Sequence, residues 1–248
     1  MRVLLDVGNT SITYGIEKNG RLSHHNSCLI DDIPKNIKKN AHGGVKIKKI
    51  AVISSVVPKN TKKLASFFKK EGYTLLIAGQ NLPVPVKHRY KKPKKLGIDR
   101  LVNIYGASRM HKTPLLVMDF GTAVTADYVS AKGVFEGGMI IPGPELGFRA
   151  LIQRAAMIPP KARLPVSTSG FLGTDTRGCM ASGILEGYSA MTDGLILRFR
   201  KRYSGPLRVI LTGGFVRHLA PYLMARVISE PLLALKSLSL LADQATPE

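Results

Sequence analysis

Two short segments of this chain combine a carboxylate with a glycine and with hydroxyl or amide side chains. Residues 6–10 read Asp-Val-Gly-Asn-Thr, and residues 119–122 read Asp-Phe-Gly-Thr. Carboxylates at strand ends can hold a divalent cation directly or through water, while glycine N–H groups and threonine hydroxyls can bind phosphate oxygens. The two segments therefore predict a nucleotide-binding site that does not use a P-loop.

Two further segments could supply the remaining groups for phosphoryl transfer. In residues 97–100, Gly-Ile-Asp-Arg, the carboxylate of Asp99 could accept a proton from an attacking hydroxyl, and Arg100 could bind an anion through two hydrogen bonds. In residues 212–214, Thr-Gly-Gly, the glycines let the backbone approach a base or ribose. A simpler alternative is that Asp99 only complements a helix dipole and that Arg100 only forms a surface ion pair.

Several familiar sites are excluded by direct search. The sequence contains no Gly-x-Gly and no Gly-Lys pair, so it has neither a dinucleotide fingerprint nor a Walker A loop. Residues 119–121 spell the DFG of protein kinases, but no HRD loop or VAIK strand accompanies them. Cys28 and Cys179 belong to no CxxC or Cys/His cluster. This pattern favours two reduced thiols over a disulfide framework or a zinc site.

The two acidic turns also indicate how the chain is organised. Each turn follows an apolar run and precedes a segment that alternates like the second strand of a hairpin, at residues 11–17 and 126–130. The second turn begins 113 residues after the first. This repeat predicts two similar α/β domains, at residues 1–113 and 114–248.

Other elements follow from hydrophobic periodicity. We expect strands at 49–57, 74–78 and 207–211, and helices at 60–71, 98–110, 175–202 and 216–224. The helix at 98–110 would carry Asp99 and Arg100 in its first turn. The helix at 175–202 contains four glycines, which each cost about 1 kcal/mol relative to alanine. Close packing against another helix would compensate for this cost.

Composition and charge limit the class of protein. The chain has 248 residues, 44% of them hydrophobic and 21% charged, as in a soluble globular protein. No apolar run approaches the roughly 20 residues of a membrane span, and the first residues turn polar too early for a secretory signal. We therefore expect a cytoplasmic protein without a membrane partner.

The net charge of +21 is concentrated in the first half of the chain. Residues 1–113 hold 23 Lys and Arg against 6 Asp and Glu. Nucleic-acid binding or attraction of anionic substrates could use such an excess. The basic runs are dominated by lysine and lack interleaved aromatic residues, so we expect a solvated basic face and no specific nucleic-acid partner.

In order and spacing, these segments resemble the type III pantothenate kinases over nearly the whole chain. The motifs that carry the resemblance are residues 6–10, 97–100, 119–125 and 137–143, with further similar pieces at 55–58, 90–93, 173–176 and 231–238. The resemblance implies the actin-like, sugar-kinase-like ATPase architecture. This is an α/β fold of two ribonuclease-H-like domains with the nucleotide in the cleft between them.

The resemblance also implies an activity and its residues. The reaction would be ATP-dependent phosphorylation of pantothenate at its terminal hydroxyl, the first step toward coenzyme A, by a homodimer that uses a divalent cation such as Mg²⁺ and a monovalent cation, K⁺ or NH₄⁺. Asp99 would be the catalytic base, and Asp119 would hold the monovalent ion. The implied ATP contacts are Asp6, Val7, Gly8, Asn9, Thr10, Ser11, Ile12, Thr13 and Thr122. The implied pantothenate contacts are Tyr90, Gly97, Ile98, Asp99, Arg100 and Thr176.

Two alternatives and one departure from the family pattern remain. The chain could be another kinase or phosphatase of the superfamily that acts on a sugar or polyphosphate, although residues 97–100 beside a second acidic turn argue against this. It could also be an inactive regulatory or nucleic-acid-associated homologue, which the three retained carboxylates, Asp6, Asp99 and Asp119, argue against. The departure is at Ala155, near the Ile158-Pro159 pair, where the family usually carries a threonine.

Overall fold

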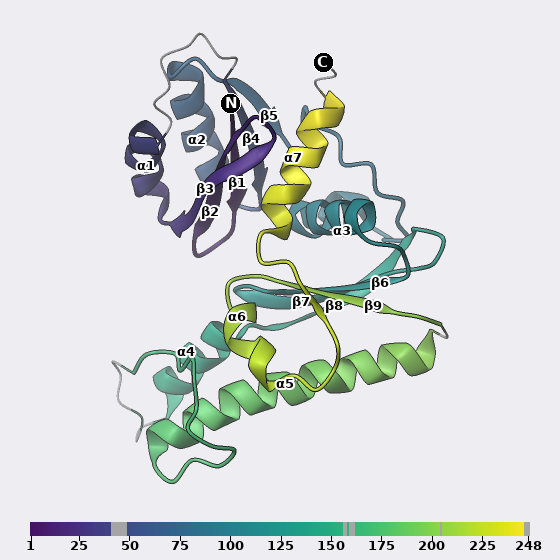
Figure 1. Cartoon of the computed structure of the whole chain (residues 1–248). Coiled ribbons are helices and arrows are strands. Elements are labelled where there is room, and N and C mark those ends of the chain that lie inside the picture. Colours follow the sequence, from purple (N-terminus) through teal and green to yellow (C-terminus); the bar gives the residue numbers. More distant parts are fainter. Residues whose placement is uncertain (41–48, 156–157, 159–161, 204, 246–248) are drawn as a thin grey trace. The chain divides into compact units, whose positions relative to one another are not determined.

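The computed structural model describes residues 1–40, 49–155, 158, 162–203 and 205–245. The chain separates into two compact units (Figure 1). Unit 1 contains residues 1–110 and 232–248, and unit 2 contains residues 111–231. Each unit is built on a five-stranded mixed sheet.

The sheet of unit 1 has the strand order β3-β2-β1-β4-β5. Its strands are β1 (Arg2–Val7), β2 (Ile12–Lys18), β3 (Arg21–Cys28), β4 (Ile50–Ser55) and β5 (Thr74–Ile77). β1 pairs antiparallel with β2 across the first acidic turn and parallel with β4 on its other side. The hairpin predicted after residues 6–10 is confirmed.

Residues of β1 alternate between two cores, one on each face of this sheet. Val3, Leu5 and Val7 pack in the core beneath α1 (Ile33–Asn40) and α2 (Pro58–Lys70). Leu4 packs in the core formed with α3 (Ile98–Met110) and α7 (Leu233–Ala245). A fully buried side chain of this size contributes about 1.5–3 kcal/mol. Because side chains alternate along a strand, Asp6 lies on the same face as Leu4, toward α3.

The last helix, α7, packs on α3 and so belongs to unit 1 rather than to the second half of the chain, where the sequence placed it. Its leucines at 235, 238 and 241 form an apolar face that is buried against the sheet and α3. The two helices approach closely at Gly106, where a Cβ would lie 1.8 Å from the Oγ of Ser237. Only glycine at 106 permits this packing distance.

The sheet of unit 2 has the order β10-β9-β6-β7-β8. Its strands are β6 (Leu115–Phe120), β7 (Ala123–Val129), β8 (Phe135–Pro142), β9 (Arg208–Thr212) and β10 (Ile228–Ser229). β6 pairs antiparallel with β7 across the second acidic turn and parallel with β9. These pairings repeat those of β1 with β2 and β4, so the second predicted hairpin is also confirmed.

The helices of unit 2 are α4 (Pro144–Arg154), the long α5 (Thr176–Arg202) and the short α6 (Val216–Leu219). α5 runs along one face of the sheet (Figure 1) and buries Leu185, Ile196 and Phe199 in its core. The helix predicted at 216–224 ends at Leu219 and continues as a 3₁₀ turn, Ala220–Tyr222, which contains Pro221. Proline removes a backbone donor and so opposes continuation of the helix.

The glycines of α5 do not make the close helix packing that their number suggested. A Cβ at Gly183, Gly187 or Gly194 would meet no described atom within 4 Å. Their face of the helix is therefore open among the described residues. None of the described helices combines the length and hydropathy that a membrane span requires.

Two 3₁₀ turns and a basic surface complete unit 1. The turns are Ile30–Asp32 and Pro93–Lys95. The lysines of the basic surface are Lys35, Lys38 and Lys39 on α1 and Lys59, Lys62, Lys63, Lys69 and Lys70 on α2. Lys38 pairs with Glu71, and Lys63 pairs with Asp31. The basic run at 46–48 lies outside the described residues. The absence of a specific nucleic-acid partner stays a prediction.

Candidate active site

The first acidic turn is held by its backbone. The strand β1 ends at Val7 and β2 begins at Ile12, and the N–H of Gly8 donates a 3.1 Å hydrogen bond to the carbonyl of Ser11. This turn exposes Asn9, Thr10 and Ser11. Exposed N–H and hydroxyl groups at a tight strand turn can bind phosphate oxygens.

Three of the predicted ATP contacts, Val7, Ile12 and Thr13, lie on the strands next to this exposed turn and not in it. The side chains of Val7 and Ile12 are almost completely buried in the core beneath α1 and α2. Their contribution to a ligand is therefore limited to the main chain. Thr13 is the register partner of Asp6 on β2 and is half-buried.

Asp6 carries an unusual charge environment. Burial and the nearby Asp99 carboxylate raise the pKa of Asp6 to about 7, and the hydroxyl of Ser54 opposes this rise. Ser54 is fully buried and is the register partner of Asp6 on β4, so the two side chains lie on the same face. The sequence analysis did not identify Ser54, because a parallel strand partner leaves no local signal. Two carboxylates that repel each other form a natural cation site.

Asp99 and Arg100 occupy the first turn of α3, as predicted. The Oδ1 atom of Asp99 accepts a 2.8 Å hydrogen bond from the N–H of Arg100. A Cβ at Gly97 would lie only 2.4 Å from the same Oδ1. Glycine at 97 therefore leaves room for the carboxylate in this orientation.

The side chain of Arg100 is held beside an aromatic ring. Arg100 is only 7% exposed, and its guanidinium carbon lies 5.9 Å from the ring centroid of Tyr90. A cation over an aromatic face is attracted by the ring quadrupole. Ile98 packs against the core that contains Val102, so its side chain serves the fold. Unit 1 thus brings together Tyr90 and residues 97–100.

The second acidic turn, in unit 2, depends on two glycines. A Cβ at Gly143 would lie 2.3 Å and 2.4 Å from the carbonyl oxygens of Gly121 and Thr122. Gly213 has φ +97°, and a Cβ there would lie 2.5 Å from the Oδ1 of Asp119. Thr212 is the register partner of Asp119 on β9. The structure therefore joins residues 212–214 and Gly143 to the turn around Asp119.

Thr176 begins α5, and Asp175 caps this helix by accepting a 2.8 Å hydrogen bond from the N–H of Gly178. Thr176 is exposed and belongs to unit 2, together with Asp119, whereas the other predicted pantothenate contacts belong to unit 1. Ala155, where the family pattern is broken, directly follows α4. Pro159 of that segment lies outside the described residues.

The donor set is consistent with magnesium held partly by substrate. Within the ranges that the structure describes, no three His, Cys, Asp or Glu side chains gather as a metal cluster. Mg²⁺ in phosphoryl-transfer sites is commonly bound by one or two carboxylates, substrate phosphates and water. Asp6, which lies close enough to Asp99 for their charges to interact, fits that requirement.

The raised pKa of Asp6 predicts a pH-dependent stability change. Between pH 4 and 7 the folded protein binds this proton more tightly than the unfolded chain, so the free energy of unfolding falls as pH rises. Asp6→Asn removes this loss of stability, because the amide does not ionise. One pKa unit corresponds to about 1.4 kcal/mol, so the gain in the free energy of unfolding at pH 8 is at most about 4 kcal/mol. We expect thermal unfolding in metal-chelating buffer to show a higher Tm for Asp6→Asn at pH 8, with the difference shrinking toward pH 4.5. Asp31→Asn, at an exposed carboxylate, is the control; an unchanged or lower Tm for Asp6→Asn at pH 8 contradicts the prediction.

Comparison with known proteins identifies relatives along the whole chain. The family model for type III pantothenate kinase matches residues 2–198. The type III pantothenate kinase of Moorella thermoacetica is 32% identical over 256 residues, covering 99% of this chain and 100% of the relative. That of Desulfosudis oleivorans is 33% identical over 257 residues, with 99% and 100% covered.

A solved structure shows the same fold at low sequence identity. The activator of 2-hydroxyisocaproyl-CoA dehydratase from Clostridium difficile, with bound ADPNP, matches with a TM-score of 0.57 and 13% identity, covering 98% of this chain and 94% of that one. This likeness confirms the predicted actin-like, sugar-kinase-like α/β fold with two similar units. Because the family model covers most of the chain and the relatives align from end to end, the chain belongs to the type III pantothenate kinase family.

Proposed function

We propose that this protein transfers the γ-phosphoryl group of ATP to the terminal hydroxyl of pantothenate, the first step toward coenzyme A. The observation that carries the proposal is the arrangement in unit 1 of a carboxylate and a buried guanidinium in one helix turn, with Asp6 close by. The relatives that align along the whole chain are named for this activity. Family membership and the retained carboxylates argue against a sugar or polyphosphate kinase and against an inactive homologue.

Asp99 acts as the base in this proposal. Phosphoryl transfer depends mainly on positioning and on charge stabilisation, so a carboxylate that orients the hydroxyl and takes its proton completes the site. The hydrogen bond from the N–H of Arg100 fixes one carboxylate oxygen and leaves the other for the substrate.

Arg100 recognises the acidic end of the substrate. Pantothenate carries a carboxylate, and a guanidinium binds carboxylates through two parallel hydrogen bonds. Tyr90 restricts the position of the Arg100 guanidinium. Thr176 of unit 2 would add a hydroxyl contact to pantothenate.

ATP binds through the two acidic turns. The main-chain and side-chain polar groups of the exposed residues 9–11, and Thr122 in unit 2, are the proposed phosphate contacts. A divalent cation, when bound, neutralises phosphate charge during transfer. Asp6 provides the negative charge that attracts this cation, and Asp119 provides a single carboxylate for a larger, loosely held K⁺ or NH₄⁺.

The proposed location is the cytoplasm. An ATP-dependent biosynthetic reaction fits this compartment, and so do the two free thiols of the protein.

A homodimer would cover the apolar surface of unit 2. Its exposed large hydrophobic residues include Ile140 on β8, Leu146 and Leu151 on α4, and Leu197 on α5. On α5, Gly183 and Gly187 present an open face that a second helix could approach closely. Isolated exposed apolar residues are common, but a gathering of them on one unit is typical of an interface.

Substrate and base are tested in one ADP-release assay. We expect release with pantothenate and not with glucose or without an acceptor. Asp99→Asn should lower kcat by roughly 10²- to 10⁴-fold, because general base catalysis contributes that much, while the affinity for an ATP analogue stays within about threefold.

The exposed carboxylate variant Asp31→Asn serves as the control and should keep normal turnover. Near-normal kcat in Asp99→Asn would remove Asp99 from the role of base. Equal ADP release with glucose would contradict the proposed substrate.

The role of Asp119 predicts dependence on a monovalent cation. Replacing K⁺ or NH₄⁺ by tetramethylammonium at constant ionic strength should lower the rate, because the bulky ion cannot enter a site formed by one carboxylate and the closely packed Gly213 backbone. Asp119→Asn should show a low rate in every salt. An unchanged rate after cation replacement contradicts this assignment.

The proposed dimer predicts that a substitution in the interface lowers both the molecular mass in solution and the activity. Light scattering should give twice the 27.0 kDa of one chain. Gly187→Leu should dissociate the dimer, since the added side chain would occupy the open face, whereas Ser66→Leu, at an exposed helical position on α2 of unit 1, should leave the mass unchanged. A monomer at micromolar concentration, or a fully active dimeric Gly187→Leu variant, would contradict the interface.

A further inference from the structure

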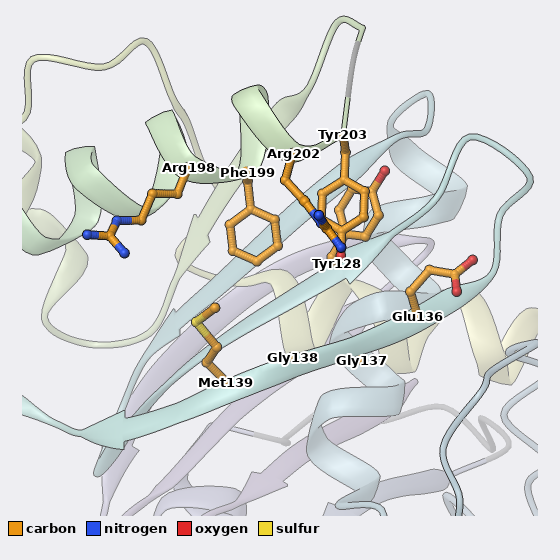
Figure 2. Close-up of a pocket in the computed structure, with 9 residues that line it drawn as sticks. All are labelled: Tyr128, Glu136, Gly137, Gly138, Met139, Arg198, Phe199, Arg202 and Tyr203. Atoms are coloured by element: carbon orange, nitrogen blue, oxygen red, sulfur yellow. The ribbon is translucent and has the colours of Figure 1, made fainter.

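A concave site lies in unit 2 between β8 and the last two turns of α5 (Figure 2). Its volume is about 370 Å³, within the range of small-molecule sites. None of the residues that line it was implicated in the reaction. The site therefore needs its own explanation.

The hollow exists because β8 lacks side chains there. Gly137 is the register partner of Tyr128 on β7, so nothing from β8 covers that ring. Gly137 has φ +136°, and the register shifts between Tyr128 and Val129. This backbone conformation favours glycine, and it allows β8 to bend at the site.

Three aromatic rings form one wall of the cavity. The rings of Tyr128 and Tyr203 are stacked with centroids 4.0 Å apart, and Phe199 lies 5.8 Å from Tyr128. Met139 of β8 points toward Phe199 from the opposite side, as Figure 2 shows. A flat apolar group inserted here would have aromatic carbon on one side and a polarizable thioether on the other.

The charge at the rim is positive. Arg198 and Arg202 both line the cavity and are one helical turn apart on α5. Within the part of the chain that the structure describes, neither guanidinium forms an ion pair or a hydrogen bond. Glu136 is the one carboxylate in the lining and has interactions of its own. Figure 2 shows the Arg202 guanidinium beside the rings of Tyr128 and Tyr203, whereas the Arg198 side chain extends away from Phe199 at the outer edge of the cavity. A guanidinium without a carboxylate partner, such as that of Arg202, is suited to bind an anion.

This cavity is distant from the acidic turn of the same unit. Tyr128 pairs with Gly137 at one end of the β7–β8 hairpin, whereas Ala123 pairs with Pro142 at the other end, next to Thr122. The two pairs lie five residue steps apart along the strands, which is about 17 Å. A ligand here would not overlap the phosphate contacts proposed for Thr122.

We propose that this cavity is a second ligand site that binds a small organic anion consisting of a flat aromatic ring and a phosphate or carboxylate group. The ring lies between the aromatic wall and Met139, and the anionic group binds Arg202, with Arg198 adding positive charge at the outer edge. Tight binding requires both the ring and the anionic group of the ligand. The aromatic wall alone cannot bind an anion, and the arginines alone cannot hold an uncharged ring.

The probe for this proposal is 1-naphthyl phosphate, titrated into the full-length protein labelled with ¹³C at its methionine methyl groups. A nonhydrolysable ATP analogue is kept at saturation so that the nucleotide site is occupied. The protein has eight methionines, and Met139→Leu identifies the Met139 resonance by its loss. We expect the Met139 methyl resonance to shift with a submillimolar Kd, and 1-naphthol or inorganic phosphate alone to bind at least about tenfold more weakly.

Matched double variants separate the site from bulk charge. Arg198→Gln/Arg202→Gln should weaken binding at least about tenfold, since the Arg202 change removes a charge-assisted hydrogen bond and the Arg198 change removes the second charge at the rim. Arg200→Gln/Lys201→Gln removes the same charge from the same exposed helix end but not from the cavity, and should change Kd less than about threefold. Thermal unfolding verifies that both variants fold.

Three results overturn the proposal. The first is a Met139 resonance that does not move at about 5 mM probe. The second is equal weakening by the two double variants, which would mean attraction by bulk charge alone. The third is a Met139 resonance that shifts with protein concentration and not with the probe, which would mean that a second copy of the chain covers the cavity.

Discussion

Repulsion between the carboxylates of Asp6 and Asp99 is the constraint on which unit 1 depends. In the proposed reaction the pair would attract a cation and leave a base beside it, but bringing like charges together in a half-buried place opposes folding. The surrounding structure must therefore hold β1 and α3 against each other. Strand pairing on both sides fixes β1, and the close contact of Gly106 with Ser237 fixes α3 against α7. The helix that carries no candidate site residue thus supports the one that does.

The two units use one strand arrangement for two kinds of charge site. In each, an Asp ends a central strand, an antiparallel hairpin follows, and a parallel strand lies on the other side. In unit 1 the neighbour of the carboxylate is a second carboxylate, whereas in unit 2 it is the backbone of Gly213. The same fold element therefore places a carboxylate in two different charge environments, which is why we propose a different cation for each.

Local patterns in the sequence were enough to predict most of the elements that carry the candidate site residues. Acidic turns, hairpins and the first turn of α3 depend on residues within a few positions of one another, so periodicity and glycine placement reveal them. Non-local contacts left no such signal. The sequence did not indicate that Ser54 lies beside Asp6, that Gly143 closes on Thr122, or that α7 returns to unit 1. The strand β3 was also missed, because its side chains are mostly polar or half-exposed and show little apolar alternation.

Residues that adjoin the candidate site in the sequence do not all belong to it in the structure. Val7, Ile12 and Ile98 adjoin polar site residues in the sequence, yet their side chains belong to the cores. A sequence motif suggests a functional role for each of its residues. In a strand or helix, however, neighbouring side chains point to different faces, so only some of them can reach the site. The glycines of α5 illustrate the opposite limit. Their spacing indicated a packing partner, but at Gly183, Gly187 and Gly194 no described part of the same chain supplies one.

The return of α7 to unit 1 has a consequence for the order in which a growing chain can fold on the ribosome. Residues 111–231 of unit 2 are contiguous, so that unit can close as soon as it emerges. Unit 1 cannot, because Leu4, Val52 and Val102 remain uncovered on one side until Leu235, Leu238 and Leu241 are synthesised. Until α7 is synthesised, unit 1 therefore carries an apolar sheet face on the side opposite the helices of the basic surface, and such faces are where chaperones bind and aggregation begins. The helix α7 completes the core of a unit whose other elements are all synthesised before unit 2.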